Sequence, residues 1–304
     1  MTAAGQGTAA GGRQALRVPR WALILAQLGP ALLVVGGLFA GGVGLGVAQS
    51  LGYLPFLGGW SWNLDAYRAV WADPAVRASF ELTFRVAFLS TAAATVLGVS
   101  AALLLHRVSR FRSTLTSVLS APLPVPHIVG ALCMLLLLSQ SGLLSRVTRA
   151  AGLTETQAEF PALTADAFGW GIIAEYVWKE SPFVAVVTLA ALTGGVDDLV
   201  GAARTLGARP WQRFRHVVLP LITPSVAATS ILVFAFTFGS YEVPFLLGRP
   251  FPAALPVVAL QYYRDVDLAA RPQAMALAVV ISVLVAVLVA VYMALLGRLV
   301  RRAP

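Results

Sequence analysis

The sequence has few charged residues, one lysine and one cysteine. Only 12% of its 304 residues are charged, against about 25% in a typical soluble domain. In contrast, 58% are apolar, and the mean hydropathy is +0.80. So few charges cannot cover the surface of a water-soluble protein of this length. The composition excludes a soluble domain and predicts a protein whose solvent is the lipid bilayer.

The scarcity of cysteine and histidine removes several kinds of site. Cys133 lies alone in an apolar run, so there is no disulfide framework. The three histidines, His106, His127 and His216, lack the spacing of metal ligands. No glycine-rich loop precedes Lys179, so the phosphate-binding loop of many ATPases is absent. We expect no metal and no cofactor in this chain.

The chain is nevertheless basic, with a formal net charge of +9. A basic chain binds nucleic acid only if its positive residues form a patch on a folded surface. Here they are scattered between long apolar runs. We therefore expect no nucleic-acid partner, and the basicity needs another explanation.

Long apolar runs are abundant, and about 20 apolar residues span the roughly 30 Å hydrocarbon core of a bilayer. The first run is longer than the apolar region of a signal peptide, so we expect a retained helix. Prolines and glycines within the runs favour irregular, packed helices around a pathway. The sequence predicts an all-α polytopic membrane protein with six transmembrane helices, at about residues 21–47, 84–105, 115–139, 169–192, 229–247 with its approach from Pro224, and 273–296.

The arginines are distributed unevenly between the two sets of connecting loops. The loops opposite the termini hold seven arginines and eight acids. The side of the termini holds two acids, Asp197 and Asp198, and thirteen arginines. An excess of cations marks cytoplasmic loops, which predicts that both termini are cytosolic. The thirteen arginines are Arg13, Arg17, Arg20, Arg107, Arg110, Arg112, Arg204, Arg209, Arg213, Arg215, Arg298, Arg301 and Arg302.

The loop between the fourth and fifth runs, residues 193–221, predicts two short helices. Asp197 and Asp198 suit the first turn of a helix, where they complement its dipole. Gly207 suits the end of that helix, where a left-handed residue is needed. Pro210 can open a second helix because its missing N–H has no partner there, and Pro220 is expected to end it.

The second of these helices is amphipathic. Trp211, Phe214 and Val218 recur at i, i+3 and i+7 and form an apolar stripe, while Arg213 and Arg215 belong to the polar face. Periodicity alone predicts a short amphipathic helix on the cytosolic surface. An interfacial helix that lies on anionic lipid would show the same pattern.

The same loop carries a recognisable pattern. Gly201-Ala202-Ala203 is followed by Gly207 and later by Val218-Leu219-Pro220. This resembles the signature cytosolic loop of permease subunits in binding-protein-dependent ABC importers, in which Glu-Ala-Ala precedes a glycine and a later Ile-x-Leu-Pro. The sequence departs from that pattern at Gly201, which replaces the glutamate, and at Val217, which replaces the isoleucine. The resemblance covers about residues 81–298 and implies the type I, MetI-like permease fold.

The resemblance implies a transport subunit in a prokaryotic cell membrane rather than an enzyme. Its expected partners are a dimer of ABC ATPase subunits that binds ATP and Mg, a second permease subunit (a paralogue or a copy), an extracytoplasmic substrate-binding protein and membrane lipid. The loop would couple ATPase closure to the membrane helices. Its implied residues are Gly201, Ala202, Ala203, Gly207, Arg209, Pro210, Trp211, Arg213, Phe214, Arg215, Leu219 and Pro220.

The apolar runs and the resemblance together predict four parts of the chain. Residues 1–20 are expected to form a disordered cytosolic tail, and residues 21–80 the first transmembrane helix and an external loop. Residues 81–298 form the permease core with the coupling loop 193–221, and residues 299–304 a short cytosolic tail.

The substrate is less closely specified. Thr205-Leu206-Gly207-Ala208 resembles the branch of the family that handles polyamines such as spermidine and putrescine, ferric iron, thiamine and sulfate. Permeases for sugars resemble one another in an Ile-Asp at this place, so a sugar-type permease is the alternative.

Ionisable groups within spans are costly and usually face a cavity or a partner. Glu175 and Lys179 could pair along their helix, and Arg85 could neutralise one of the acids. If Glu180 and Glu242 face the pathway, they would favour a cation such as a polyamine. The candidate path residues are Glu180, Ser181, Ser240, Tyr241 and Glu242.

Two other classes compete with the importer. An ion-coupled secondary transporter would explain six spans and buried carboxylates, but it leaves the loop from Gly207 to Pro220 unexplained and lacks paired broken helices. A membrane-embedded enzyme needs a nucleophile with a base, or a metal cluster, and no such motif is present.

Overall fold

The computed structural model describes residues 19–55, 58–60, 62–108 and 111–302. The expected tail of residues 1–20 therefore lies outside the described residues, except for Pro19 and Arg20. Contacts divide the chain into two units, residues 1–45 and 46–304. The first unit contains most of helix α1 (Arg20–Ser50), which is long and apolar enough to cross a bilayer.

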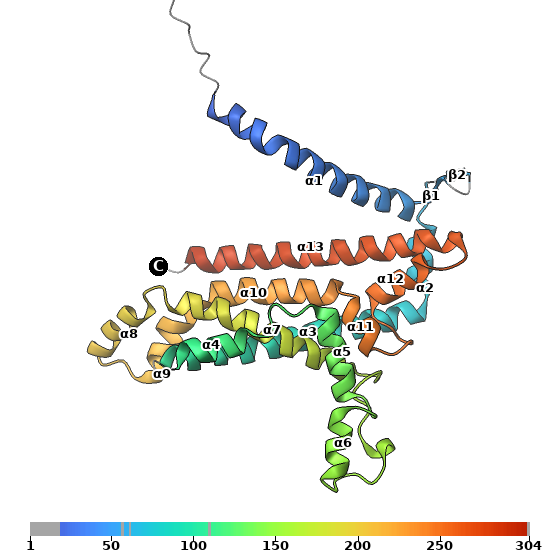
Figure 1. Cartoon of the computed structure of the whole chain (residues 1–304). Coiled ribbons are helices and arrows are strands. Elements are labelled where there is room, and N and C mark those ends of the chain that lie inside the picture. The colour runs from blue at the N-terminus through green and yellow to red at the C-terminus, as the bar shows by residue number, and fades with distance from the viewer. Residues whose placement is uncertain (1–18, 56–57, 61, 109–110, 303–304) are drawn as a thin grey trace, which may run out of the picture. The chain divides into compact units, whose positions relative to one another are not determined.

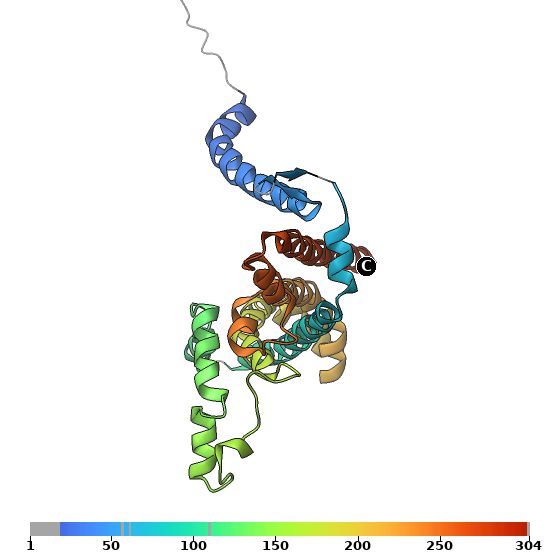
Figure 2. The same cartoon turned by 90° about the vertical axis from the view of Figure 1, so that its right-hand side faces the viewer.

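The second unit begins with the last residues of α1, which are followed by a short antiparallel pair of strands, β1 (Tyr53–Leu54) and β2 (Gly59–Trp60), and by helix α2 (Asp65–Ala72). Its long helices are α3 (Pro74–Arg107), α7 (Trp170–Leu192), α10 (Leu219–Gly239) and α13 (Arg271–Arg302). Figure 1 shows these helices side by side, and Figure 2 views them nearly end-on. The architecture is the all-α bundle that the sequence predicts.

Helices α3 and α7 form the central pair of this bundle. Gly98 permits their close approach, because a Cβ at that position would lie 2.6 Å from the Cβ of Val184 and 2.7 Å from the carbonyl oxygen of Ser181. Around this pair, one core cluster contains Leu82, Tyr176 and neighbouring apolar side chains of α3, α5, α7 and α11. Any side chain at position 98 would force the two helices apart.

The third predicted span, residues 115–139, is not one helix. The chain forms α4 (Arg112–Ser120), a turn, and then α5 (His127–Leu138) and α6 (Leu143–Ala150). Figure 1 shows α5 and α6 running across the direction of the bundle. Pro122, Pro124 and Pro126 explain the break, because each removes a backbone donor and clashes with a continuing helix.

The fifth predicted span, residues 229–247, ends early. Helix α10 stops at Gly239, and α11 (Glu242–Leu247) follows after Ser240 and Tyr241. Glu242 therefore begins a separate short helix and does not lie within the span. The remaining elements before α13 are α12 (Leu255–Tyr263) and a 3₁₀ turn, η4 (Leu268–Ala270); another 3₁₀ turn, η2 (Gln157–Glu159), precedes α7.

Among the described residues, five helical segments are long and apolar enough to cross a membrane: 24–50, 74–107, 127–150, 210–239 and 268–294. A sixth is formed if α7 and the following helix α8 (Val196–Thr205), bent by 59° relative to each other, count as one span. Helix α13 extends to Arg302, so residues 299–302 of the expected tail are helical.

Candidate functional site

The first helix of the coupling loop, α8, ends as its sequence predicts. Asp197 and Asp198 lie in its first turn. Gly207 follows its end with φ +82° and donates to the carbonyl of Arg204, while Ala208 donates to the carbonyl of Ala203, both at 3.0 Å. These two bonds close the helix in a Schellman motif, which needs a left-handed residue. The glycine of the loop pattern therefore has a conformational role.

The second helix starts at Pro210 but does not end at Pro220. Helix α9 (Pro210–Arg213) continues through a π-helical turn, η3 (Phe214–Val218), into α10. Pro220 has no N–H to donate to the preceding turn, and in the wider turn Leu219 donates to the carbonyl of Phe214. The prediction that Pro220 ends the helix is wrong. The short amphipathic helix is the first part of a continuous helix over residues 210–239.

The two most exposed large apolar side chains of the coupling loop are Leu206 and Trp211, and Leu199 is exposed as well. Leu206 is 88% and Trp211 is 65% exposed, and they flank the turn at Gly207. Around them lie the exposed arginines Arg204, Arg209 and Arg215. Gly201, Ala202, Pro210, Leu219 and Pro220 are also exposed, whereas Ala203 and Arg213 are half-buried.

Phe214 is directed differently from Trp211, although the two rings lie 5.5 Å apart. Phe214, Val218 and Arg213 line a groove of about 420 Å³. The opposite wall of this groove comes from α3, α7 and α8, including Leu103, Leu192, Val196 and Val200. The apolar stripe is therefore divided: Trp211 is exposed at the surface, whereas Phe214 and Val218 line the groove.

A side-chain contact ties the coupling loop to the end of α3. The Nε2 atom of His106 lies 2.9 Å from Oδ1 of Asp197, at the start of α8. Sequence reasoning missed this contact, because the two residues lie on different helices far apart in the chain and no spacing rule relates them.

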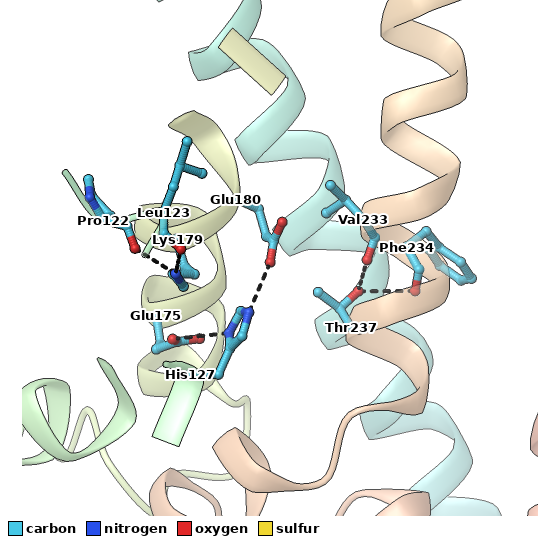
Figure 3. A network of polar contacts seen from close by, with 9 residues as sticks. All are labelled: Pro122, Leu123, His127, Glu175, Lys179, Glu180, Val233, Phe234 and Thr237. Atoms are coloured by element: carbon cyan, nitrogen blue, oxygen red, sulfur yellow. Dashed lines mark hydrogen bonds and ion pairs between the residues drawn. The ribbon is translucent and has the colours of Figure 1, made fainter. Parts of the chain in front are cut away.

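The second site is centred on the lysine. Nζ of Lys179 donates to the carbonyl oxygens of Pro122, at 2.5 Å, and Leu123, at 2.9 Å (Figure 3). Pro124 and Pro126 have no N–H groups, so this segment offers few backbone donors, and the N–H of Val125 donates to the carbonyl of Pro122 at 3.1 Å. The lysine adds a second donor to Pro122 and supplies one to Leu123. The expected pairing of Lys179 with Glu175 along α7 is wrong.

His127 lies between two carboxylates of α7 (Figure 3). Its Nδ1 atom is 3.6 Å from Oε1 of Glu175, and its Nε2 atom is 3.6 Å from Oε1 of Glu180. Glu175 is fully buried, and neither of its carboxylate oxygens has a hydrogen bond. Gly130 permits this approach, since a Cβ there would lie 2.9 Å from Oε1 of Glu175. We call His127, Glu175, Lys179 and Glu180 the polar cluster.

A cavity of about 380 Å³ opens beside the polar cluster. Helices α7 and α10 and the segment around α5 contribute its walls. Three members of the polar cluster line it together with apolar and aromatic side chains. The lining residues are Leu123, His127, Lys179, Glu180, Phe183, Leu232, Val233 and Phe236.

The five candidate path residues do not come together in this cavity. Only Glu180 lines it, and Ser181 donates to the carbonyl of Val177 at 2.5 Å. Ser240, Tyr241 and Glu242 lie at the break between α10 and α11, and Tyr241 lines a separate cavity of about 360 Å³ beside α12 and α13.

Arg85 does not neutralise any of the buried acids. Its guanidinium donates to the carbonyl of Ala167 at 3.0 Å and lies 4.7 Å from the ring centroid of Phe168. In the described part of the chain, no group of three or more His, Cys, Asp or Glu residues is arranged to hold a metal ion.

Comparison with known proteins finds relatives over most of the chain. Residues 94–303 match the family described as binding-protein-dependent transport system inner membrane component. The molybdenum transport permease protein ModB of Azotobacter vinelandii is 30% identical over 202 residues, covering 66% of this chain and 85% of ModB. The trehalose/maltose transport permease protein MalF of Thermococcus litoralis is 29% identical and covers 66% of each chain. The putrescine transport permease protein PotI of Escherichia coli is 26% identical and covers 72% of each.

Solved structures have the same fold. A chain of a bacterial ABC transporter involved in the import of the acidic polysaccharide alginate superposes with a TM-score of 0.74 at 19% identity, covering 92% of this chain and 95% of that one. A chain of the MetNI methionine ABC transporter, in an inward-facing conformation, gives a TM-score of 0.51 at 20% identity and covers 77% and 94%.

Proposed function

This chain belongs to the family of binding-protein-dependent transport system inner membrane components, and from that premise we propose how it performs the task of an ABC importer permease. It forms half of a translocation pathway, the other half coming from a second permease subunit. Its coupling loop docks on an ABC ATPase dimer, and a substrate-binding protein delivers the solute from outside. ATP is hydrolysed by the separate ATPase subunits, so the chain is a transport subunit and no enzyme.

The observation that carries this proposal is the continuous helix over residues 210–239. One end of it bears Trp211 in the exposed part of the coupling loop, and the other bears Leu232, Val233 and Phe236 in the wall of the cavity. A displacement at Trp211 would therefore be carried to the cavity wall along one helix, through the π turn η3. The contact of His106 with Asp197 would carry the same displacement to α3.

The docking surface in this proposal consists of Leu206 and Trp211, with Arg204, Arg209 and Arg215 around them. Exposed apolar anchors surrounded by charge are the usual anatomy of a binding hot spot. Arginine is well suited to such a rim because its guanidinium forms directed hydrogen bonds. The half-buried Phe214 would instead hold the loop against α3 and α8.

We place the coupling loop and both termini in the cytosol. The excess of arginine on that side supports this orientation. It explains the basic net charge of a very apolar chain as a matter of topology. It also leaves α6 and the 3₁₀ turn η2 on the outer side, where the substrate-binding protein would dock.

For the substrate, we propose a polyamine such as putrescine or spermidine, or a related small ion. The relatives named above transport molybdenum, putrescine and trehalose or maltose, so the family alone leaves the substrate open. The Thr205-Leu206-Gly207-Ala208 form of the loop and the acidic side chain of Glu180 in the cavity support the polyamine. A sugar-type solute is the alternative.

A double substitution tests the docking surface. With Leu206→Ala and Trp211→Ala, we expect the chain to insert into the membrane normally but to lose co-purification with its ATPase and solute uptake by proteoliposomes of the complete importer. Trp71→Ala is the matched control, since Trp71 is 73% exposed on α2, away from the coupling loop. Normal ATPase association and uptake in the double variant would refute the assignment of the docking surface.

The solute is identified by a separate measurement. Uptake of labelled putrescine, molybdate and maltose is compared in proteoliposomes of the native importer.

A further inference from the structure

We propose that the cavity beside the polar cluster is a binding site for a protonated amine, with the carboxylate of Glu180 as its acceptor. The inference rests on the proposed function, since it assumes that solute passes along this chain, and it goes further by naming the site and its chemistry. Glu242 does not line this cavity and has no part in the proposed site.

Glu180 is the member of the polar cluster that is free to accept a ligand. The residue is 9% exposed, and it lines the cavity. In the described part of the chain, its carboxylate has no hydrogen bond, and its ion-pair partner is His127 at 3.6 Å. A carboxylate held this far from water strongly favours a donor that can approach to hydrogen-bond distance.

The two basic groups in the cavity are already engaged. Lys179 donates to the carbonyls of Pro122 and Leu123, and an anion that drew it away would leave both oxygens without that donor. His127 faces the fully buried carboxylate of Glu175 with its other nitrogen. An anionic ligand would therefore have to break interactions on which buried groups depend, whereas a cation needs to approach only Glu180.

The balance of charge leads to the same ligand. In the polar cluster, two carboxylates face one lysine and one histidine. The carboxylates outnumber the lysine by one, and a single ammonium group on Glu180 makes the numbers of carboxylate and ammonium groups equal.

The remainder of the lining suits the rest of such a ligand. Phe183 and Phe236 contribute aromatic rings, which attract ammonium groups through their faces. Leu232 and Val233 offer apolar surface to a short alkyl chain. The cavity of about 380 Å³ is at the small end of ligand sites, so it fits a small aliphatic amine better than a sugar oligomer.

Protection of a cysteine from labelling tests the site in the complete importer. Leu232 lines the cavity and is 57% exposed, so Leu232→Cys in a Cys133→Ser background gives a single thiol at the site. The rate of maleimide labelling is measured in proteoliposomes with putrescine, sulfate or maltose as the probe. We expect putrescine, at several times its Kd, to slow labelling by about fivefold, and sulfate and maltose to leave the rate unchanged.

Two further variants assign the protection to one carboxylate. Glu180→Gln should abolish protection by putrescine, while Glu242→Gln, which neutralises a carboxylate outside the cavity, should retain it. Protection by sulfate instead of putrescine, or equal protection in Glu180→Gln, would overturn the proposal. If Glu180→Gln does not fold, the comparison of the three probes on Leu232→Cys still decides between an amine and an anion.

The same preparation separates failure of the site from failure of the proposed function. Uptake and ATPase stimulation without any protection would mean that the importer works and the ion pair of His127 with Glu180 is structural. Absence of ATPase association and uptake would instead reject the importer assignment.

Discussion

The coupling loop and the polar cluster use charge in opposite environments. In the loop, the arginines and the exposed side chains of Leu206 and Trp211 lie at the surface, and short-range geometry fixes their positions. In the polar cluster, Glu175, Lys179 and Glu180 are buried, His127 is half-buried, and each has a partner from another segment of the chain. Surface charges contribute little to stability, whereas a buried charge is costly unless it is paired. We therefore expect substitutions in the loop to alter coupling and substitutions in the cluster to alter folding.

Replacing the lysine should give the largest change in stability. Lys179→Met keeps the length of the side chain but removes the donor to the carbonyls of Pro122 and Leu123. It also removes the positive charge beside the carboxylate of Glu180, which lines the same cavity. Removing one partner from a buried charged group costs about 3–5 kcal/mol, so we expect a loss of that size in the free energy of unfolding. Unfolding in mixed detergent measures it.

Arg215→Met is the matched control for that substitution, because it removes an exposed cation of the coupling loop. We expect it to change the free energy of unfolding by less than about 0.5 kcal/mol. Equal losses of unfolding free energy in Lys179→Met and Arg215→Met would contradict the expected difference between the polar cluster and the coupling loop.

Removing the histidine should have the next largest effect. His127→Ala leaves the fully buried Glu175 without its partner, and breaking a buried pair in this way costs about 3 kcal/mol. Adding Glu175→Gln removes the unpaired charge and should restore more than half of the loss. The four members of this double-mutant cycle are compared by unfolding in the same detergent. Additive effects would show that the two side chains do not interact.

The end of helix α8 allows a smaller test within the coupling loop. Gly207→Ala places a side chain at φ +82°, which costs about 1–2 kcal/mol. We expect a modest fall in the melting temperature together with a large loss of uptake, because Leu206 and Trp211 would be displaced from each other. Asparagine tolerates left-handed geometry better than alanine, so Gly207→Asn should recover part of the melting temperature and part of the uptake. A fall in melting temperature with unchanged uptake in Gly207→Ala would contradict the role of this turn in coupling.

Gly201 should give the smallest effect. It lies in α8, and a Cβ added there meets no atom within 4 Å. Because glycine is a poor helix former, Gly201→Ala should stabilise the chain by about 1 kcal/mol. Gly201→Glu restores the residue usual in the loop pattern and should stabilise by about half as much, since Asp197 lies four residues earlier and repels it. The melting temperatures of the two variants check this order, and a fall in either would contradict it.

The two regions also differ in how far the sequence could predict them. The caps at Gly207 and Pro210 depend on neighbouring residues, so local rules located them correctly. The extent of the second helix was mispredicted at Pro220, because a proline ordinarily ends a helix and the π turn that accommodates it leaves no clear local signal. The helical bundle followed from the long apolar runs.

The polar cluster could not be predicted in the same way. Lys179 finds its partners at the proline break between α4 and α5, and His127 meets the two glutamates only after α5 packs on α7. Local spacing instead suggested a pair between Glu175 and Lys179 on one helix. That pair ignores the carbonyls of Pro122 and Leu123, which become available to the lysine only because the third predicted span is broken.

In the proposed mechanism, movement of the coupling loop reaches the cavity through the helix over residues 210–239. The most direct test of this mechanism is the labelling rate of Leu232→Cys, in the Cys133→Ser background, in the reconstituted importer with and without ATP trapped by vanadate. We expect the rate to differ several-fold between the two states, and we expect Leu206→Ala with Trp211→Ala to abolish the difference. A labelling rate that is the same in both states, while uptake continues, would contradict it.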